Sequence, residues 1–349
     1  MRYYLAILTF LILTGCKNSE EKKEFFDPIQ SLEIQEIYSD TVSIRAIDIL
    51  NDGSLSFAGS NGKYGLYNPE SKIWNTAVLK QDSITPHFRA VAHTAEDFFM
   101  LSIESPALLY KTGPKGMEIV YTEDDPKAFY DSMIFWNDKE GIAMGDPTDG
   151  CISIIITRDG GNSWKKLDCS ILPEAAEGEA AFAASNTNIA VYGDNAWIIT
   201  GGMKSNVLHT ANKGRSWELF ETPLVQGTAT TGGYSISFYD ENIGVIIGGD
   251  YTNPLSNTGN KALTKDGGKT WTLISDSTEP GYRSCIQFIP GSNGKELLAI
   301  GFKGIDYSND QGSNWKNLST EDFFTVRFLN DSIAYAAGTN RVAQLKFKR

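Results

Sequence analysis

One turn pattern recurs four times between residues 157 and 315, and it constrains the fold more than any other feature of the chain. It consists of Ser or Thr, a spacer, Asp or Asn, a spacer, Gly, two spacers and Trp. The copies are Thr157–Trp164, Thr210–Trp217, Thr264–Trp271 and Ser308–Trp315, with Asp159, Asn212, Asp266 and Asp310 as their second polar residues. Such side chains bond backbone N–H groups of their own turn, and glycine supplies backbone freedom at the tip. Each copy therefore predicts a hairpin turn that joins two β-strands.

The tryptophan that ends each copy is expected to pack between neighbouring units and to find an acceptor for its indole N–H. These residues are Trp164, Trp217, Trp271 and Trp315. Two degenerate copies come earlier: residues 67–74 keep the Trp without the Asp-Gly core, and residues 111–119 have Ile119 in place of the Trp. Short strands separated by turn residues accompany the copies, which predicts an all-β repeat architecture.

The repeats predict a closed ring of seven units. They begin near residues 41, 86, 128, 177, 228, 281 and 322. The last unit has room for only about three strands of ordinary length, while residues 32–38 alternate like a lone strand. We therefore expect residues 32–38 to complete the last unit and to remove the open sheet edge. Six or eight units remain alternatives, because the first two are weakly marked.

These motifs resemble the Asp-box (BNR) repeat over about residues 40–349. That repeat is found in sialidases, in xyloglucan-processing enzymes and in the photosystem II assembly factor family of propellers. The resemblance implies an all-β fold, namely a seven-bladed β-propeller closed by an N-terminal strand. It implies little about activity, because the turns lie on the outer part of each blade and function resides in sites elsewhere.

The first residues have the features of an export signal. A positive residue precedes an apolar run from Tyr3 to Leu13, which is too short for an ordinary membrane span. The small residue Gly15 precedes Cys16, which resembles the lipobox of bacterial lipoproteins. A plain secretory signal that happens to contain a cysteine is the alternative.

The lipoprotein interpretation divides the chain into three parts. We expect residues 1–15 to form the signal peptide, residues 16–29 a lipidated polar tether that begins at Cys16, and residues 30–349 a single propeller domain. Lys17 follows the cysteine, where the inner-membrane retention signal of enteric bacteria has Asp. The predicted location is therefore the outer membrane, on its periplasmic or its outer side.

Charge and cysteine content narrow the function classes further. The net charge is −12 and the pI is near 4.8, which argues against nucleic acid and against electrostatic binding to anionic lipid. Contact with the membrane is expected through the lipid anchor only. Cys151 and Cys169 flank the first turn at similar distances, which suits either a cross-strand disulfide or two buried thiols. Cys285 is expected in the core.

Arginines recur near the start of three predicted inner strands, at Arg45, Arg89 and Arg283. Inner strands converge on the mouth of the central channel, where propeller ligands usually bind. We expect these arginines, with Glu179 and Tyr234 opposite them, to bind a carboxylate or sulfate group, which guanidinium groups match bidentately.

The alternative for these arginines is structural. Each would pair with a neighbouring carboxylate, such as Glu104, Asp131 or Glu179, and hold the blades in register. The stretch Glu179–Asn188, interpreted as an inner strand, has unusually small side chains. Small residues suit a tapered channel or the close approach of a ligand.

Catalysis is a competing hypothesis. Sialidases with this repeat use an arginine triad, a Tyr–Glu pair and an Asp, and they carry an Arg-Ile-Pro element that this chain lacks. Glycosidases generally need two facing carboxylates, and the spacing here singles out no pair. The candidates are Asp131, Asp146, Glu179 and Asp250. We therefore assign no catalytic residue and keep a sialidase-like glycoside hydrolase or a lyase acting on acidic glycans as the alternative.

Cofactor chemistry has little support in the sequence. The three histidines form no cluster with cysteines at metal-ligand spacing, and no Gly-rich phosphate loop precedes a helix. We expect no metal and no cofactor. The leading prediction is a non-catalytic binding or assembly propeller of the cell envelope, which recognises a protein partner or an acidic ligand such as a glycan at the channel mouth. A purely structural role is the third hypothesis.

Overall fold

The computed structural model describes residues 27–81 and 83–349; the predicted signal peptide and Cys16 lie outside these residues. Strands dominate the described part, and its one helix is a short 3-10 turn, η1 (Cys169–Ile171). No helix in that part is long and apolar enough to cross a membrane. The prediction of an all-β fold is confirmed.

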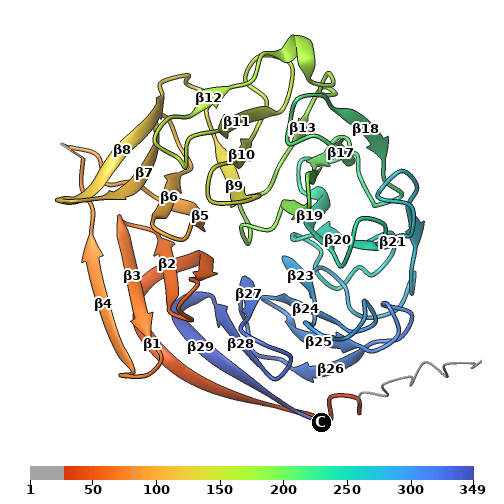
Figure 1. The fold of residues 1–349 in the computed structure, drawn as a ribbon. Coiled ribbons are helices and arrows are strands. Elements are labelled where there is room, and N and C mark those ends of the chain that lie inside the picture. Colours follow the sequence, from red (N-terminus) through yellow and green to blue (C-terminus); the bar gives the residue numbers. More distant parts are fainter. Residues whose placement is uncertain (1–26, 82) are drawn as a thin grey trace, which may run out of the picture.

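The strands are arranged as sheets around a common centre (Figure 1). The largest sheet has the order β27 (Thr325–Phe328), β28 (Ile333–Ala337), β29 (Thr339–Lys348), β1 (Ser31–Ile49), β2 (Leu55–Gly59), β3 (Lys63–Asn68) and β4 (Ile73–Val78). The next contains β5 (Phe88–His93), β6 (Phe98–Ser102), β7 (Ala107–Gly113) and β8 (Gly116–Glu123). A further four-stranded sheet contains β9 (Tyr130–Phe135), β10 (Gly141–Gly145), β11 (Ser153–Thr157) and β12 (Lys165–Lys166).

The remaining sheets continue the ring. One contains β14 (Ile189–Tyr192), β15 (Asn195–Ile199), β17 (Asn206–Thr210) and β18 (Glu218–Glu221). The next has the order β13 (Glu179–Ala180), β16 (Gly201–Gly202), β19 (Thr231–Phe238), β20 (Gly244–Asp250), β21 (Lys261–Thr264) and β22 (Thr272–Leu273). The last contains β23 (Cys285–Phe288), β24 (Leu297–Gly301), β25 (Gly304–Ser308) and β26 (Lys316–Ser319).

The long strand β1 belongs to both halves of the largest sheet. Its first part pairs antiparallel with β29, where Leu32 lies opposite Phe347, and its last part pairs with β2, where Ile47 lies opposite Phe57. The register shifts between Ser39 and Ser43, where the strand passes from one half to the other. Segments from the two ends of the described chain therefore lie side by side (Figure 1).

The four repeated turns share one hydrogen-bond pattern. Thr157 Oγ1 donates to Asp159 Oδ1 (2.9 Å) and accepts from the backbone N–H of Gly161 (2.9 Å). Asp159 Oδ1 also accepts from the backbone N–H of Ser163 (3.0 Å). The turns around Asn212, Asp266 and Asp310 repeat these three contacts. The polar side chains thus supply partners that a tight turn leaves its backbone without.

The tryptophans of these turns fall into two groups. Trp271 Nε1 and Trp315 Nε1 donate to the carbonyl oxygens of Gly268 and Gly312, each at 2.9 Å. Trp164 Nε1 and Trp217 Nε1 are buried and meet no acceptor among the described residues, so the expectation of an acceptor was wrong for these two. Both rings pack into apolar clusters, where their contribution is buried area.

Cys151 and Cys169 form a disulfide with Cα atoms 5.7 Å apart, and Cys285 is a buried free thiol. The disulfide joins the loop after β10 to η1. The chain then runs through residues 172–178 towards the centre of the molecule. It is held there by hydrogen bonds from Ala175 N to Gly150 O (2.9 Å) and from Ala181 N to Asp146 Oδ1 (2.8 Å).

Residues 181–188, which we call the central segment, cross the middle of the ring. Asn186 Nδ2 donates to Val91 O in β5 (2.8 Å), and its Oδ1 accepts from Met133 N in β9 (2.9 Å). Ser185 Oγ donates to Ser284 O (2.7 Å), next to β23. The expectation of an inner strand at Glu179–Asn188 was therefore wrong, since only Glu179–Ala180 form a strand there and β14 starts at Ile189. Small side chains let the segment enter the narrow centre, and neighbouring sheets supply its hydrogen bonds.

Candidate functional site

Irregularities in the inner strands aim three side chains at one place. Arg45 is the unpaired residue of a bulge in β1, and Arg89 occupies the same kind of position in β5. Tyr234 is the unpaired residue of a bulge in β19. A bulge adds one residue to a strand and re-aims its side chain, which explains how inner strands from different sheets direct these groups to the channel mouth.

Arg45, Arg89 and Tyr234 line one cavity of about 410 Å³, within the usual range for ligand sites. Residues 180–184 form part of its wall, and four of them, 181–184, belong to the central segment. The cavity is also lined by Phe129, Asp146, Ala229, Tyr251, Tyr282 and Phe302. The structure thus brings three of the five predicted ligand-binding residues together.

The two cavity arginines carry charge without a carboxylate partner. Neither forms an ion pair within 4.0 Å among the described residues, and the Nε atom of each is buried without a hydrogen-bond partner. Arg45 stacks its guanidinium carbon 3.8 Å from the ring centre of Phe324, and Arg89 Nη1 donates a long bond to Ala183 O (3.4 Å). Burial lowers the pKa of both; burial, then the neighbouring Arg45 charge, lowers the pKa of Arg89 to about 10, so Arg89 remains cationic at neutral pH.

Another part of the cavity wall is aromatic. The rings of Phe182 and Tyr234 stack with centres 3.9 Å apart, and Tyr282 meets Tyr234 edge-on at 4.8 Å. Phe302 packs against Tyr282 at 5.4 Å. The Tyr234 hydroxyl donates to Thr230 O (2.7 Å), which fixes the ring among its aromatic neighbours. Such a wall suits a ligand that has an apolar part beside its anionic group.

Two carboxyl groups accompany the arginines without pairing with them. Asp146 is the one acidic residue of the cavity wall in the described chain, and burial raises its pKa despite the bond from Ala181 N. Asp131 is fully buried, and neither of its oxygens meets a hydrogen-bond donor in the described residues. Burial, then the nearby Asp146, raise the pKa of Asp131 well above its usual value. Asp131 and Glu104 act on the charge of Arg89 through space, and neither pairs with it within 4.0 Å.

The other two predicted residues lie elsewhere, in internal contacts. Arg283 is 4% exposed and binds Asp306 through Nε and Nη2, each at 2.6 Å, so the structural alternative describes this arginine. Glu179 is also buried and accepts from Thr200 Oγ1 (2.5 Å) and Asn206 Nδ2 (3.0 Å). Neither residue lines the mouth cavity.

Several cavity residues were not assigned to the binding site at the sequence level, and Asp146 was considered only as a candidate catalytic carboxylate. Asp146 and Phe302 each follow a glycine that ends the second strand of its sheet, Gly145 or Gly301, and this spacing was a usable signal. The other missed residues are Phe129, Phe182, Tyr251 and Tyr282. No group of three or more His, Cys, Asp or Glu residues in the described chain has the geometry to hold a metal ion.

Solved structures with the same architecture define the fold. No protein-family model matches the chain, and no curated protein matches its sequence. The chain is similar to a structure of YCF48 bound to D1 peptide, with a TM-score of 0.64 and 12% identity over 92% of this chain and 98% of that one. It is also similar to catalytically inactive virginiamycin B lyase from Staphylococcus aureus with quinupristin, with a TM-score of 0.65 and 11% identity over 90% and 99% of the two chains.

A third similar structure is the GH74 xyloglucanase from Xanthomonas campestris, with a TM-score of 0.62 and 12% identity over 89% of this chain and 53% of that one. These neighbours include a binding protein and two enzymes. Identities this low establish the fold alone, because one fold hosts many functions. The chain is a β-propeller.

Proposed function

We propose that this protein is a non-catalytic binding or assembly propeller of the cell envelope, and that its mouth cavity recognises an acidic group of a protein partner or of a glycan. One observation carries the proposal: Arg45 and Arg89 place two half-buried charges in a cavity, and neither has a carboxylate partner within 4.0 Å among the described residues. A charge that is partly removed from water without a partner is destabilising. An anionic ligand would offset that cost through charge-assisted hydrogen bonds.

The proposal includes a ring of seven Asp-box blades closed by β1. Seven groups of four strands can be assigned if the largest sheet is divided within β1 and the short strands β13 and β16 are set aside from the six-stranded sheet. The pairing of Leu32 with Phe347 supports closure, because it covers the edge that β29 would otherwise expose. The shared hydrogen bonds of the four turns support the Asp-box assignment.

Lipid attachment at Cys16 is the part of the proposal that rests on sequence. A short polar tether would hold the propeller at the outer membrane, close to membrane-bound partners. Replacing the lipidated residue, Cys16→Ser, should release the protein from the membrane fraction of a bacterial host and abolish its labelling by radioactive palmitate. Unchanged membrane association without labelling of the wild type would remove the anchor from the proposal.

A glycosidase function has weaker support from the site. It requires two carboxyl groups that face the substrate across roughly 5–10 Å. Asp146 faces the cavity, whereas Asp131 is fully buried and does not line it. The similarity to xyloglucanase concerns the fold. We therefore place ligand binding ahead of catalysis.

The binding function can be tested with two sets of immobilised probes: acidic peptides, and glycans that carry sialic acid or uronic acid. The double variant Arg45→Gln/Arg89→Gln should lose at least tenfold in affinity for the probes that the wild type binds. Arg215→Gln is the matched control, since its side chain is 65% exposed on an outer turn. Binding that is equal in all three proteins, or absent from the wild type across both sets, would overturn the proposed anion site.

A further inference from the structure

A second cavity, which shares no lining residue with the mouth cavity, lies between the β1–β4 part of the largest sheet and the β5–β8 sheet. Its volume is about 540 Å³, larger than the mouth cavity. Its walls come from the β1–β2 loop, from β3 and β4, and from the two hairpin loops of the β5–β8 sheet. Its lining includes Asp52, Tyr64, Leu66, Thr76, Glu96 and Met117.

The repeated turns explain why such a space is filled at other junctions. Each of three turns packs its glycine against the preceding sheet so closely that a β-carbon would overlap with a neighbour. That carbon would lie 2.2 Å from Phe99 at Gly161, 2.4 Å from Ile156 at Gly214 and 3.0 Å from Trp197 at Gly268. A turn of the following sheet therefore covers the preceding one, and its tryptophan packs near the junction.

The turn of the β5–β8 sheet has lost this contact. A β-carbon on Gly116 would meet no atom within 4 Å. Ile119, which stands in place of the motif tryptophan, is 40% exposed. The hairpin itself survives, because β7 and β8 pair from Ala107–Glu123 to Gly113–Gly116. Decay of the motif has kept the strand pairing and left the junction open.

The open junction combines an apolar floor with an acidic rim. Tyr64, Leu66, Phe98 and Met117 provide apolar surface. Among the residues that the structure describes, its lining has three acidic side chains, Asp52, Glu96 and Asp97, and no Lys, Arg or His. Lys111 approaches Asp97 at 3.1 Å, which leaves the exposed Asp52 and Glu96 to set the charge of the rim.

We propose that this cavity is a second binding site, which receives a turn or loop of a protein partner carrying one large apolar side chain flanked by Lys or Arg. The occupant is a polypeptide turn because that is what covers the corresponding junctions within this molecule. It is basic because the rim is acidic, and charges of opposite sign that face each other across an interface favour the complementary partner. The large apolar side chain of the partner fills the space that a turn with its tryptophan covers at the other junctions. The flanking Lys or Arg side chains pair with Asp52 and Glu96. This site is independent of the anion site at the channel mouth.

The test uses cyclic twelve-residue peptides with one central Trp and zero, two or four flanking Lys residues. Affinity for the wild-type protein should rise at least tenfold from zero to four lysines and should fall with added salt. Asp52→Asn/Glu96→Gln should remove the dependence on lysine. Thr76→Trp, which places a ring in the cavity from an exposed position, should abolish binding without altering the surface charge.

Two controls separate this site from the mouth and from a small-ligand pocket. Arg45→Gln/Arg89→Gln should bind the lysine peptides as the wild type does, so failure of one site leaves the other testable. Tryptamine, an aromatic amine without a peptide backbone, should bind at least a hundredfold more weakly than the best peptide. Peptide binding that ignores lysine content, persists in Thr76→Trp or is matched by tryptamine would overturn the proposal.

Discussion

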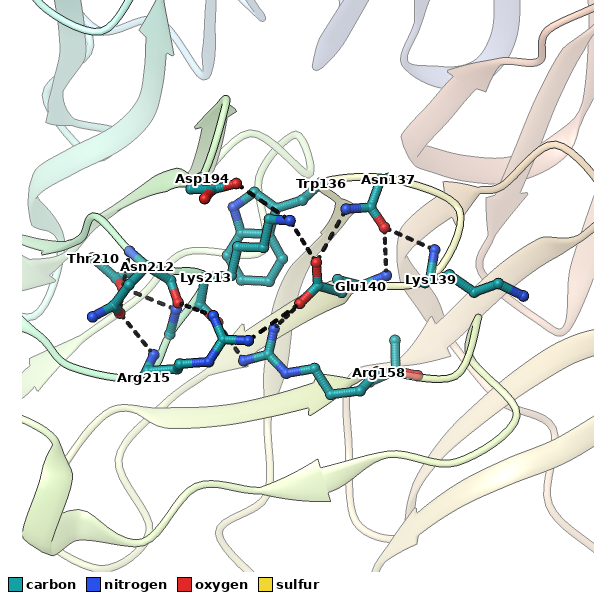
Figure 2. Close-up of polar contacts among 12 residues, drawn as sticks. Trp136, Asn137, Lys139, Glu140, Arg158, Asp194, Thr210, Asn212, Lys213 and Arg215 are labelled. Carbon is teal, nitrogen blue, oxygen red and sulfur yellow. Dashed lines mark hydrogen bonds and ion pairs between the residues drawn. The ribbon is translucent and has the colours of Figure 1, made fainter.

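Two junctions between neighbouring sheets differ in the side chains that cross them: the junction between the β9–β12 and β14–β18 sheets, and the junction between the β1–β4 part of the largest sheet and the β5–β8 sheet. Between β9–β12 and β14–β18, Glu140 accepts from Lys213 Nζ (2.5 Å) and from Arg158 Nη1 (2.8 Å), and Arg158 Nη2 reaches Lys213 O (2.5 Å). Figure 2 shows these side chains meeting from two repeated turns and the β9–β10 loop. The β1–β4 and β5–β8 junction is crossed instead by His93 of β5, whose Nδ1 lies 2.7 Å from Asp48 Oδ2 and whose Nε2 lies 3.4 Å from Oδ1 of the cavity-wall residue Asn51.

This difference shows that the repeated turn does two separable things. It closes its own hairpin, which needs only local hydrogen bonds, and it covers the neighbouring sheet, which needs the glycine, the tryptophan and suitably placed charges. The β7–β8 hairpin retains the first property without the second. A degenerate copy of a repeat can therefore leave a surface available for binding.

The largest expected effect comes from the tryptophan of a covered junction. Trp271 is 9% exposed, packs edge-on against Phe238 and bonds Gly268 O, so Trp271→Ala should lower the free energy of unfolding by about 3–5 kcal/mol. Ile119→Ala, at the equivalent position of the open junction, should cost less than about 0.5 kcal/mol because the side chain is already 40% exposed. Urea unfolding measures both values. Equal losses would contradict the distinction between covered and open junctions.

The covered junctions were also the part of the molecule that the sequence predicted best. The turn pattern is local, so eight residues contain the donors and acceptors that define it. The shared position of Arg45 and Arg89 near the start of predicted inner strands likewise placed them with Tyr234 at the mouth. Arg283 could not be separated from them by spacing, because its partner Asp306 belongs to β25, twenty-three residues later.

The rest of the mouth depends on contacts between distant segments. The central segment was interpreted as a strand because its composition suits one, whereas its actual partners belong to sheets on several sides of the channel. Glu179 lies outside the cavity and accepts hydrogen bonds from Thr200 and Asn206, which follow it by more than twenty residues. Periodicity contains no information on such pairings.

A smaller effect, with a defined pH dependence, is expected from the clamp in Figure 2. Bonds from Lys213, then Asn137, and the charges of Lys213 and Arg158 lower the pKa of Glu140 to about 2, although burial opposes this. A carboxyl whose pKa is lower in the folded state contributes stability above its unfolded pKa and loses it as the pH falls towards the folded value. Glu140→Gln should therefore cost about 1 kcal/mol at pH 7.

The cost of Glu140→Gln should shrink as the pH falls from about 4.5 to about 2, because the wild-type carboxylate is then protonated. Unfolding midpoints in urea between pH 7 and pH 2.5 measure this convergence. Glu118→Gln is the matched control, since Glu118 is exposed on β8 beside the open junction and should change stability little at any pH. Parallel pH profiles for the wild type and Glu140→Gln would show that the charges of the clamp do not stabilise the covered junction. Its advantage over the open one would then rest on buried glycine and tryptophan contacts alone.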